Sequence, residues 1–319
     1  GITEAGAMSS FIGAGTAYAT HGLNMMPFFV YYSMFGLQRV GDLVWAAADM
    51  CAKGFLVGGT AGRTTLAGEG LQHQDGNSHL LAYPVPNLVA YDPAFAFELA
   101  VIIRDGIRRM YEEQENVFYY ITIMNENYAM PAMPGDVKAG ILKGMYRFKN
   151  GSNASSGLVA NLLGSGTIMN ETLKAAEILE EKYGVSAHVY SVTSYKELRK
   201  DAMDVERHNM LHPDKEKVPY VSTLIDNYGV IVAASDYVKT LPDSIAKWLP
   251  NKLYALGTDG FGRSEGRNEL RDFFEVDAKH IVFATLYALY KEDKFKLTDL
   301  KKAMKELDIN PDKLNPMHV

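Results

Sequence analysis

The sequence predicts an α/β protein of two domains, each built around a mostly parallel sheet. The chain has 319 residues, which is about twice the length of a common single domain. Short apolar segments alternate with longer amphipathic segments, and this is the order of elements around a parallel sheet. A cluster of turn-forming residues at 149–153, near the middle of the chain, marks the best boundary between the two halves.

Four candidate strands lie in the first half of the chain. Each is a short apolar or aromatic run bounded by turn residues, and they cover 28–32, 55–57, 87–91 and 117–124. The run at 28–32 is expected to be a buried strand. Helices are predicted at 36–52, where Leu37, Val40 and Val44 repeat at helical spacing, and at 94–112.

The second half of the chain repeats this alternation. Strands are predicted at 159–163, 187–192, 228–233 and 253–257, and helices at 171–183, 235–249 and 278–291. We therefore expect a first domain over 1–135, a linker over 136–155 and a second domain over 156–319.

The composition excludes several classes of protein. Lys and Arg number 32 against 38 Asp and Glu, so no broad basic surface is available and no nucleic-acid partner is expected. The single cysteine, Cys51, excludes a disulfide framework and a cysteine-based zinc finger, and it favours a reducing compartment. No uninterrupted apolar run reaches about 18 residues, so a membrane span is not expected.

The first residues are unusual for the start of a translated chain. Gly1 stands where an initiator Met is usual, and the basic-then-apolar order of a signal peptide is missing. We interpret the sequence as part of a longer protein, and such a part can carry half of a site.

The loop over 58–79 contains the densest set of chemically active side chains. Its length and its irregular, glycine-rich sequence are typical of functional or disordered loops. Four of its side chains can transfer protons, namely Glu69, His73, Asp75 and His79. The alternative, of equal weight on composition alone, is a solvated polar loop.

A metal site is a further alternative for this loop. Glu69, His73 and His79 would make a set of two histidines and one carboxylate, which binds non-haem iron in other proteins. Their spacing matches no named metal motif, and the sequence has neither HExxH nor a cysteine pair. We therefore predict no metal ligand in this sequence.

Two further features suggest a binding cleft. Glu4 lies among small residues, where a desolvated carboxylate would favour a hydrogen-bonded partner, although an exposed terminal Glu is the more frequent arrangement. Tyr31, Tyr32 and Phe35 lie at the end of the apolar run at 28–32 and could form a stacking surface for a flat heterocycle. The alternative is that these rings belong to the core.

Three other segments have both a functional and a structural interpretation. Residues 125–128 follow the fourth strand, where parallel sheets bind ligands, or they begin a capped turn. The glycine-rich segment 257–264 lacks the Walker and dinucleotide patterns, so it is either another anion cradle or a structural turn at an interface. His208 and His212 are four residues apart, but Pro213 favours an irregular segment there.

Four motifs in order closely resemble the homodimeric, bacterial type of pyruvate dehydrogenase E1 component. They are GITEAGA at 1–7, YYSMFG at 31–36, GEGLQH at 68–73 and GTDGFG at 257–262. The resemblance runs through the whole sequence and implies a transketolase-like fold. It also implies that the sequence is similar to the last third of such a chain, with most of a pyrimidine-binding middle domain followed by a transketolase-like C-terminal domain.

The resemblance implies an enzyme that uses thiamine diphosphate and Mg²⁺ to decarboxylate pyruvate and to pass the acetyl unit to the lipoyl group of the E2 component. Glu4 resembles the carboxylate that hydrogen-bonds the aminopyrimidine ring nitrogen. Phe35 resembles the ring that stacks on the aminopyrimidine, with Tyr32 nearby. His73 and Glu69 resemble residues on the substrate side of the cofactor, with His73 as a proton donor or hydrogen-bond partner.

The resemblance also implies what this sequence leaves out. The family holds Mg²⁺ and the diphosphate with a Gly-Asp-Gly motif and a later Asn, a pair that is missing from this sequence. We therefore expect a cytoplasmic homodimer whose partners are pyruvate and the lipoyl domain of E2, with this portion inactive alone. The alternatives are a transketolase or another 2-oxo acid dehydrogenase E1, and a non-catalytic dimerisation or interaction fragment.

Overall fold

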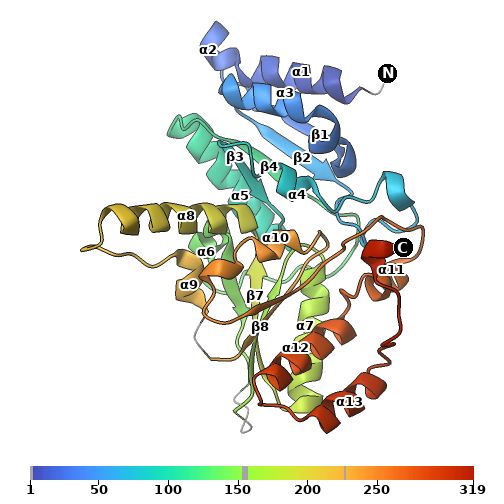
Figure 1. Cartoon of the computed structure of the whole chain (residues 1–319). Helices are drawn as coiled ribbons and strands as arrows, with labels where there is room; N and C mark the ends of the chain where they lie inside the picture. The colour runs from blue at the N-terminus through green and yellow to red at the C-terminus, as the bar shows by residue number, and fades with distance from the viewer. Residues whose placement is uncertain (1–2, 153–156, 226–227) are drawn as a thin grey trace.

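Two sheets, one in each half of the chain, form the framework of the molecule (Figure 1). The computed structural model describes residues 3–152, 157–225 and 228–319. Residues 153–155 of the expected linker, and 1–2, 156 and 226–227 of the expected domains, lie outside the described residues. None of the described helices is both long and apolar enough to cross a bilayer.

The first sheet is parallel throughout and has the strand order β1-β2-β4-β3. Its strands are β1 (Phe28–Tyr32), β2 (Phe55–Gly59), β3 (Leu88–Tyr91) and β4 (Phe118–Thr122). The helices of this half are α1 (Glu4–Gly15), α2 (Ala17–His21), α3 (Leu37–Asp49), α4 (Ser78–Leu81) and α5 (Ala96–Ile107), which the π-helical turn η3 (Arg108–Glu112) extends. This arrangement confirms the predicted α/β class.

Burial differs between the two edges of this sheet. Strand β3 is buried along its whole length and packs against a helix of the second half, α8 (Tyr195–Leu211). The expectation of a buried strand at 28–32 is wrong, because the side chains of Phe28 and Val30 in β1 are 50% and 62% exposed. Of the described strands, β1 pairs with β2 alone. The side chains of Phe29 and Tyr31 face the core, and those of the alternate residues point away from it.

The second sheet has the order β5-β7-β6-β8-β9 and is parallel except for β5. Its strands are β5 (Met145–Lys149), β6 (Val159–Gly164), β7 (Ser186–Val192), β8 (Val230–Ala234) and β9 (Leu253–Leu256). Besides α8, its helices are α6 (Lys138–Lys143), α7 (Ile168–Tyr183), α9 (Tyr220–Leu224), α10 (Thr240–Asp243), α11 (Arg267–Phe273), α12 (Ala278–Lys291) and α13 (Leu297–Glu306). Helices α7 and α12 pack together and against the sheet.

Two segments of the second half differ from their sequence-based expectation. Residues 136–155, expected to be a linker, contain α6 and β5, and β5 is the antiparallel edge strand of the second sheet. The domain ranges themselves stay a prediction. Residues 235–249, expected to be one helix, form only α10 and the turn η4 (Ala246–Trp248). The backbone N–H of Val238 bonds to Gly76 of the first half, which holds this segment in a loop.

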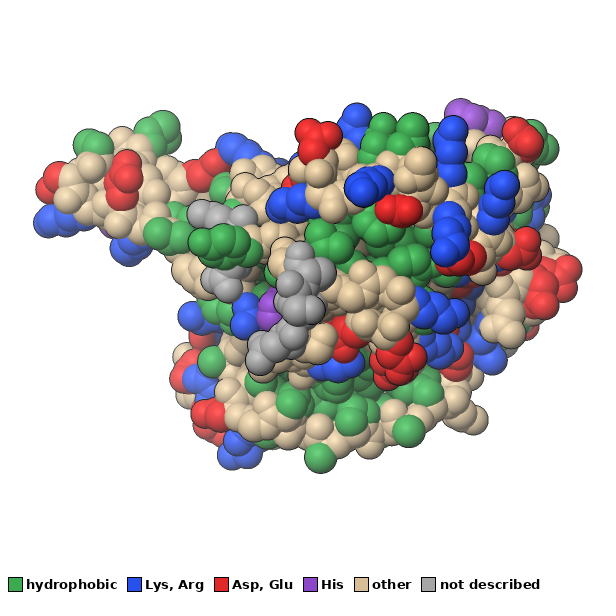
Figure 2. All heavy atoms as spheres, turned by 90° about the horizontal axis from the view of Figure 1, so that it is seen from below, with side chains coloured by type: hydrophobic (Ala, Val, Ile, Leu, Met, Phe, Trp, Pro, Cys, Tyr) green, Lys and Arg blue, Asp and Glu red, His purple; other side chains and the backbone are tan. Residues whose placement is uncertain are grey.

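Helix α8 (Tyr195–Leu211) includes a segment that was expected to be irregular. The segment near His208, expected to be irregular, is helical as far as Leu211, and Pro213 follows the end of the helix rather than interrupting it. The last turns of α8 extend from the body of the molecule as an arm (Figures 1 and 2). The side chain of Met210 on this arm is 76% exposed.

The two halves meet through a buried polar network. Asp92 Oδ1, just after β3, accepts hydrogen bonds from Thr122 Oγ1 (2.6 Å) and from the hydroxyl of Tyr237 in the second half (3.3 Å). Thr122 Oγ1 also lies 3.0 Å from His79 Nε2. Burial raises the pKa of Asp92 to about 7 and lowers the pKa of His79 to about 4. Both groups therefore favour their neutral forms in the folded protein.

These pKa directions give opposite pH dependences of stability. The contribution of Asp92 is complete below the ordinary carboxyl pKa, near 4, and is lost as the pH rises through about 7. For His79, stability is instead lost as the pH falls from the ordinary histidine pKa toward about 4. The two effects partly cancel in the native protein.

Replacing Asp92 with Asn should remove one of these two pH dependences and leave the other. Asn is neutral at every pH, so the melting temperature of Asp92→Asn relative to the native protein should rise between pH 5 and pH 8, by on the order of 5 °C. Thermal denaturation followed by circular dichroism measures the difference. Asp214→Asn, at an exposed position, is the control, and its melting temperature relative to the native protein should not change with pH. A flat difference for Asp92→Asn would show that Asp92 is ionised in the fold.

Candidate functional site

A tight turn after β1 presents two aromatic rings at the edge of the first sheet. Strand β1 ends at Tyr32 and continues into the one-turn helix η1 (Ser33–Phe35). A Cβ atom at Gly36 would lie 1.9 Å from the ring of Tyr31, so only glycine lets the chain pass this buried ring. The turn places the rings of Tyr32 and Phe35 with their centroids 5.9 Å apart.

The loop over 58–79 brings His73 to these rings. The His73 ring centroid lies 5.5 Å from that of Tyr32 and 5.3 Å from that of Phe35, the latter in an edge-to-face arrangement. His73 follows a one-turn helix, η2 (Gly70–Gln72), which Glu69 precedes. Three of the predicted site residues, distant in sequence, therefore form one aromatic cluster.

Glu69 lies beside His73, as the spacing of four residues predicts. His73 Nδ1 is 3.3 Å from Glu69 Oε2, at an angle that makes no hydrogen bond. The contact is therefore an ion pair only when the imidazole is protonated. The side chains of His73 and Glu69 are 29% and 42% exposed, so both are accessible to a ligand.

Glu4 joins the same surface through Arg39. Glu4 is the first residue of α1, after the N-cap Thr3, and its Oε1 accepts a hydrogen bond of 3.3 Å from Arg39 Nη1. The Arg39 guanidinium also lies 4.1 Å from the ring centroid of Phe35. The Glu4 side chain is 18% exposed, so the alternative of an exposed terminal Glu is wrong, and Arg39 compensates the cost of its burial.

A pocket of about 460 Å³ opens beside Glu4, between the first turns of α1 and strand β1. Glu4 and Tyr32 both line this pocket. Its other lining residues are Thr3, Ala7, Phe29, Val30 and Tyr31. Tyr31 itself is buried against Tyr120 and belongs to the core, so of the three rings proposed for a stacking surface only Tyr32 and Phe35 are available.

The proton-transfer side chains of the loop separate into two groups. Glu69 and His73 face the aromatic cluster, whereas Asp75 and His79 are buried. His79 packs edge-to-face on Tyr237 and lies beside Thr122. The alternative metal set of Glu69, His73 and His79 is therefore not assembled.

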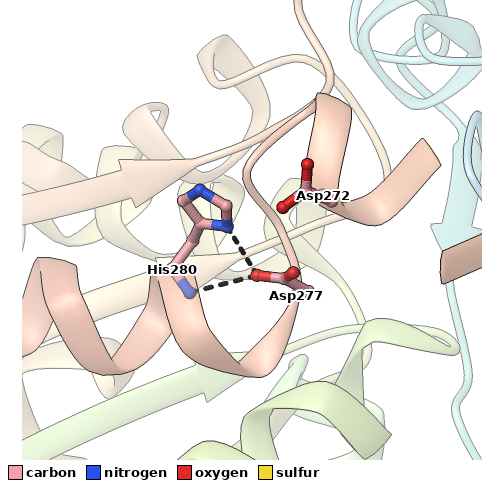
Figure 3. A group of neighbouring side chains, drawn as sticks. All are labelled: Asp272, Asp277 and His280. Carbon is pink, nitrogen blue, oxygen red and sulfur yellow. Dashed lines mark hydrogen bonds and ion pairs between the residues drawn. The ribbon is translucent and has the colours of Figure 1, made fainter. Parts of the chain in front are cut away.

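A different cluster, Asp272, Asp277 and His280, is the one group of described residues whose ligand atoms lie close enough for a metal ion (Figure 3). Asp277 is the N-cap of α12, where it accepts from the backbone N–H and lies 2.6 Å from Nδ1 of His280. Asp272 is paired with Lys279 at 2.6 Å. These contacts account for the cluster as a helix cap and an ion pair.

The loop over 58–79 is fixed at its beginning by the second half of the chain. Asp236, which is completely buried, accepts hydrogen bonds from the backbone N–H and the hydroxyl of both Thr64 and Thr65, at 2.6–3.1 Å. Burial raises the pKa of Asp236, which the donated hydrogen bonds and Arg271 oppose. Arg63 donates to the carbonyl oxygens of Thr258 and Gly260. The solvated-loop alternative is therefore wrong.

The segment 257–264 is a structural turn at this interface. Its carbonyl oxygens point inward onto the cation of Arg63, an arrangement that an anion cradle could not have. Gln74 donates from Nε2 to the carbonyl of Arg263 and accepts from its N–H, both at 2.8 Å. A Cβ atom at Gly262 would lie 2.6 Å from Gln74 Oε1, so glycine is required for this close approach.

Residues 125–128 are also structural. Glu126 pairs with the buried guanidinium of Arg271, with Oε1 3.3 Å from Nη1, and Arg271 lies 3.6 Å from Glu171. The hydroxyl of Tyr128 donates to the carbonyl of Ala94 at 2.5 Å. The segment forms no turn, so the capped-turn alternative is wrong, and its side chains serve tertiary contacts instead.

Sequence reasoning missed Arg39, the residue that connects Glu4 to Phe35. Arg39 lies in the first turn of α3, while Phe35 ends η1 just before that helix, and the turn at Gly36 brings the guanidinium over the Phe35 ring. Its pairing with Glu4, 35 positions away in the sequence, has no local signal.

Comparisons with known families match both halves of the chain. Residues 1–131 match the family described as the pyruvate dehydrogenase E1 component middle domain, and residues 144–277 match the transketolase-like TK C-terminal domain. Proteins named pyruvate dehydrogenase E1 component are similar along the whole chain. The one from Pseudomonas aeruginosa is 53% identical over 99% of this chain, and that from Escherichia coli K12 is 51% identical over 99%. The chain spans 36% of the length of each.

Solved structures show the same fold at low sequence identity. Transketolase from Campylobacter jejuni has a TM-score of 0.62 at 18% identity, over 84% of this chain and 36% of that one. A structure described as a split gene transketolase, inactive beta4 tetramer, has a TM-score of 0.61 at 17% identity, over 91% of this chain and 83% of that one. The fold is therefore transketolase-like.

Gln74→Ala should loosen the loop against the second half. The substitution removes the two contacts with Arg263 and a third, 2.8 Å from Gln74 Nε2 to the carbonyl of Leu66. We expect about 2 kcal/mol less free energy of unfolding and hydrogen exchange at the Arg263 amide faster by about tenfold. Mass spectrometry of exchanged peptides measures this. Gln72→Ala, an exposed neighbour, is the control. Equal exchange rates in both variants would contradict the interface role.

Proposed function

The chain belongs, by homology over its whole length, to the C-terminal portion of the pyruvate dehydrogenase E1 components, and from this we propose that it carries one half of a thiamine diphosphate-dependent site that decarboxylates pyruvate. The observation that carries the proposal is the contact chain from Glu4 through Arg39 and Phe35 to His73. It unites a carboxylate, a stacking ring and an imidazole on one surface.

The residues present fit the aminopyrimidine of the cofactor. The guanidinium of Arg39 is planar and cationic, and it contacts both the Phe35 ring and the Glu4 carboxylate. A planar heterocycle with a protonated ring nitrogen satisfies the same two groups by stacking and by a charge-assisted hydrogen bond. The pocket of about 460 Å³ beside Glu4 offers room for such a ring.

Each residue that contacts the aminopyrimidine then has a defined role. Glu4 accepts a hydrogen bond from the ring nitrogen and holds a proton at that atom, because a largely desolvated carboxylate favours a cationic donor. Phe35 supplies the stacking face, and Tyr32 lines the side of the pocket. When bound, thiamine diphosphate supplies the electron sink for the loss of CO₂.

His73 and Glu69 act on the substrate side. The imidazole is held edge-on to Phe35 and remains accessible, so it can hydrogen-bond to a substrate oxygen or give it a proton. Glu69, with Oε2 3.3 Å from His73 Nδ1, places a carboxylate beside the imidazole.

We place the ligands of the diphosphate and of Mg²⁺ outside this sequence, since the relatives are nearly three times as long. The description of a similar split-gene chain as inactive supports the proposal that this portion needs a second part for activity. The remaining elements of the proposal are a cytoplasmic homodimer and the lipoyl domain of E2 as the acceptor of the acetyl unit. The much higher identity to E1 components than to transketolases favours pyruvate over sugar phosphates.

Glu4→Gln tests the proposed role of the carboxylate. In a fusion of this sequence to the preceding part of the Pseudomonas aeruginosa relative, we expect pyruvate decarboxylation to fall by about 100-fold, because the amide cannot hold the proton on the ring nitrogen. Release of CO₂ with an artificial electron acceptor measures the rate. Glu216→Gln, at an exposed position, should be fully active, and the unfused chain should be inactive. A fully active Glu4→Gln fusion would remove Glu4 from the mechanism.

His73→Ala tests the substrate side separately. The same fusion should lose about 100-fold in turnover, because the proton donor is missing, while calorimetry should find its affinity for thiamine diphosphate unchanged. His21→Ala, an exposed histidine at the end of α2, is the matched control and should keep both properties. Loss of cofactor binding in His73→Ala would show that His73 is structural instead.

A further inference from the structure

We propose that Asp75 is a positioning residue whose buried carboxylate fixes the turn that carries Phe35 against the loop that carries His73. The consequence for catalysis rests on the proposed function, but the geometric claim does not. Asp75 stands two residues after His73, and its hydrogen-bond partner Ser33 stands two residues before Phe35. The bond between them therefore spans the two segments close to the point where their rings meet.

The two carboxylate oxygens of Asp75 bond to different elements. Oδ2 accepts from the hydroxyl of Ser33 at 2.6 Å. Oδ1 accepts from Nε2 of Gln38, at the start of α3, at 2.9 Å. The same oxygen accepts from the backbone N–H groups of Asn77 and Ser78 at 2.9 and 3.0 Å. One side chain thus joins η1, α3 and the end of the loop.

Burial makes these bonds strong and specific. The side chain of Asp75 is completely buried, and so is that of Ser33. A buried carboxylate is stable only with several donors, and charge-assisted bonds to it are about twice as strong as neutral ones. The Gln38 amide nitrogen and the two backbone N–H groups can only donate hydrogen bonds. The side chain at position 75 must therefore accept all three.

The direct contacts among Glu69, His73, Tyr32 and Phe35 do not fix His73 relative to Phe35. The contact between Glu69 and His73 makes no hydrogen bond, and the rings of Tyr32, Phe35 and His73 touch only by van der Waals and ring interactions. Without the Asp75 link, the loop and the turn would be joined at this point only by those weak contacts. The position of His73 relative to Phe35 should therefore depend on Asp75.

Ser33→Ala is the sharpest test, because it removes the link to η1 and leaves Asp75 its three other donors. The chain has eight histidines, so nuclear magnetic resonance of histidine-labelled protein, with His73→Gln for assignment, resolves the His73 ring signals. Ring currents of Tyr32 and Phe35 displace these signals in the native chain. In Ser33→Ala and Asp75→Asn the displacement should fall by more than half.

Asp236→Asn is the matched control. It alters an equally buried carboxylate that holds the other end of the same loop, so it should lower the melting temperature and leave the His73 signals in place. Native His73 signals in folded Ser33→Ala and Asp75→Asn would overturn the positioning role. The readout needs no cofactor, so it stands even if the fusion proves inactive.

In an active fusion, Ser33→Ala should lower kcat by about tenfold with KM for pyruvate unchanged, because misplacement of a catalytic group costs rate rather than ground-state binding. Ser33→Thr keeps the hydroxyl and should retain most of the rate. A rise in KM alone would contradict positioning of His73.

Discussion

The carboxylate of Asp236 is the contact on which the start of the loop over 58–79, and its attachment to the second half of the chain, depend. It lies just beyond β8 in the second half of the chain, and it receives two backbone N–H groups and two hydroxyls from Thr64 and Thr65 in the first half. A loop this long has a large conformational entropy to lose. The buried carboxylate removes that freedom at the start of the loop, at Thr64 and Thr65, whereas the end of the loop near His73 is held separately by Asp75.

The loop is held by hydrogen bonds near both of its ends, and its middle is exposed to solvent. Arg63 and Gln74 join it to the segment 257–264, and Asp75 joins its end to the turn after β1. Between these anchors, Leu71 is 53% exposed and Glu69 is 42% exposed. A frame that is rigid at both ends can present such side chains to a ligand while keeping their backbone in place. This explains why a polar loop of such length is ordered although the one-turn helix η2 is the only regular element among the described residues between β2 and α4.

Local patterns in the sequence were enough to predict the parallel strands of both sheets and the short-range contact of Glu69 with His73. Apolar runs identify β2, β3 and β4 because these strands are largely buried, and the spacing of Glu69 and His73 anticipates their contact. Contacts between distant polar residues have no such pattern, as with Glu4 and Arg39. Strand β5 was missed because an antiparallel edge strand does not follow the strand-helix alternation. The exposure of Phe28 and Val30 depends on which face of β1 other elements cover, and the apolar run does not record this.

The carboxylates around the site differ in the number and strength of the hydrogen bonds that they accept. Asp75 and Asp236 are completely buried, and each holds four hydrogen bonds that fix the backbone. Among the described residues, Glu4 instead has a single hydrogen bond, of 3.3 Å, from Arg39, whose side chain is 53% exposed. Such a pair contributes on the order of 0.5 kcal/mol, so a ligand can replace the guanidinium at little cost. The fold therefore uses strong contacts where the backbone is fixed and a weak one at Glu4, where the proposed ligand would replace Arg39.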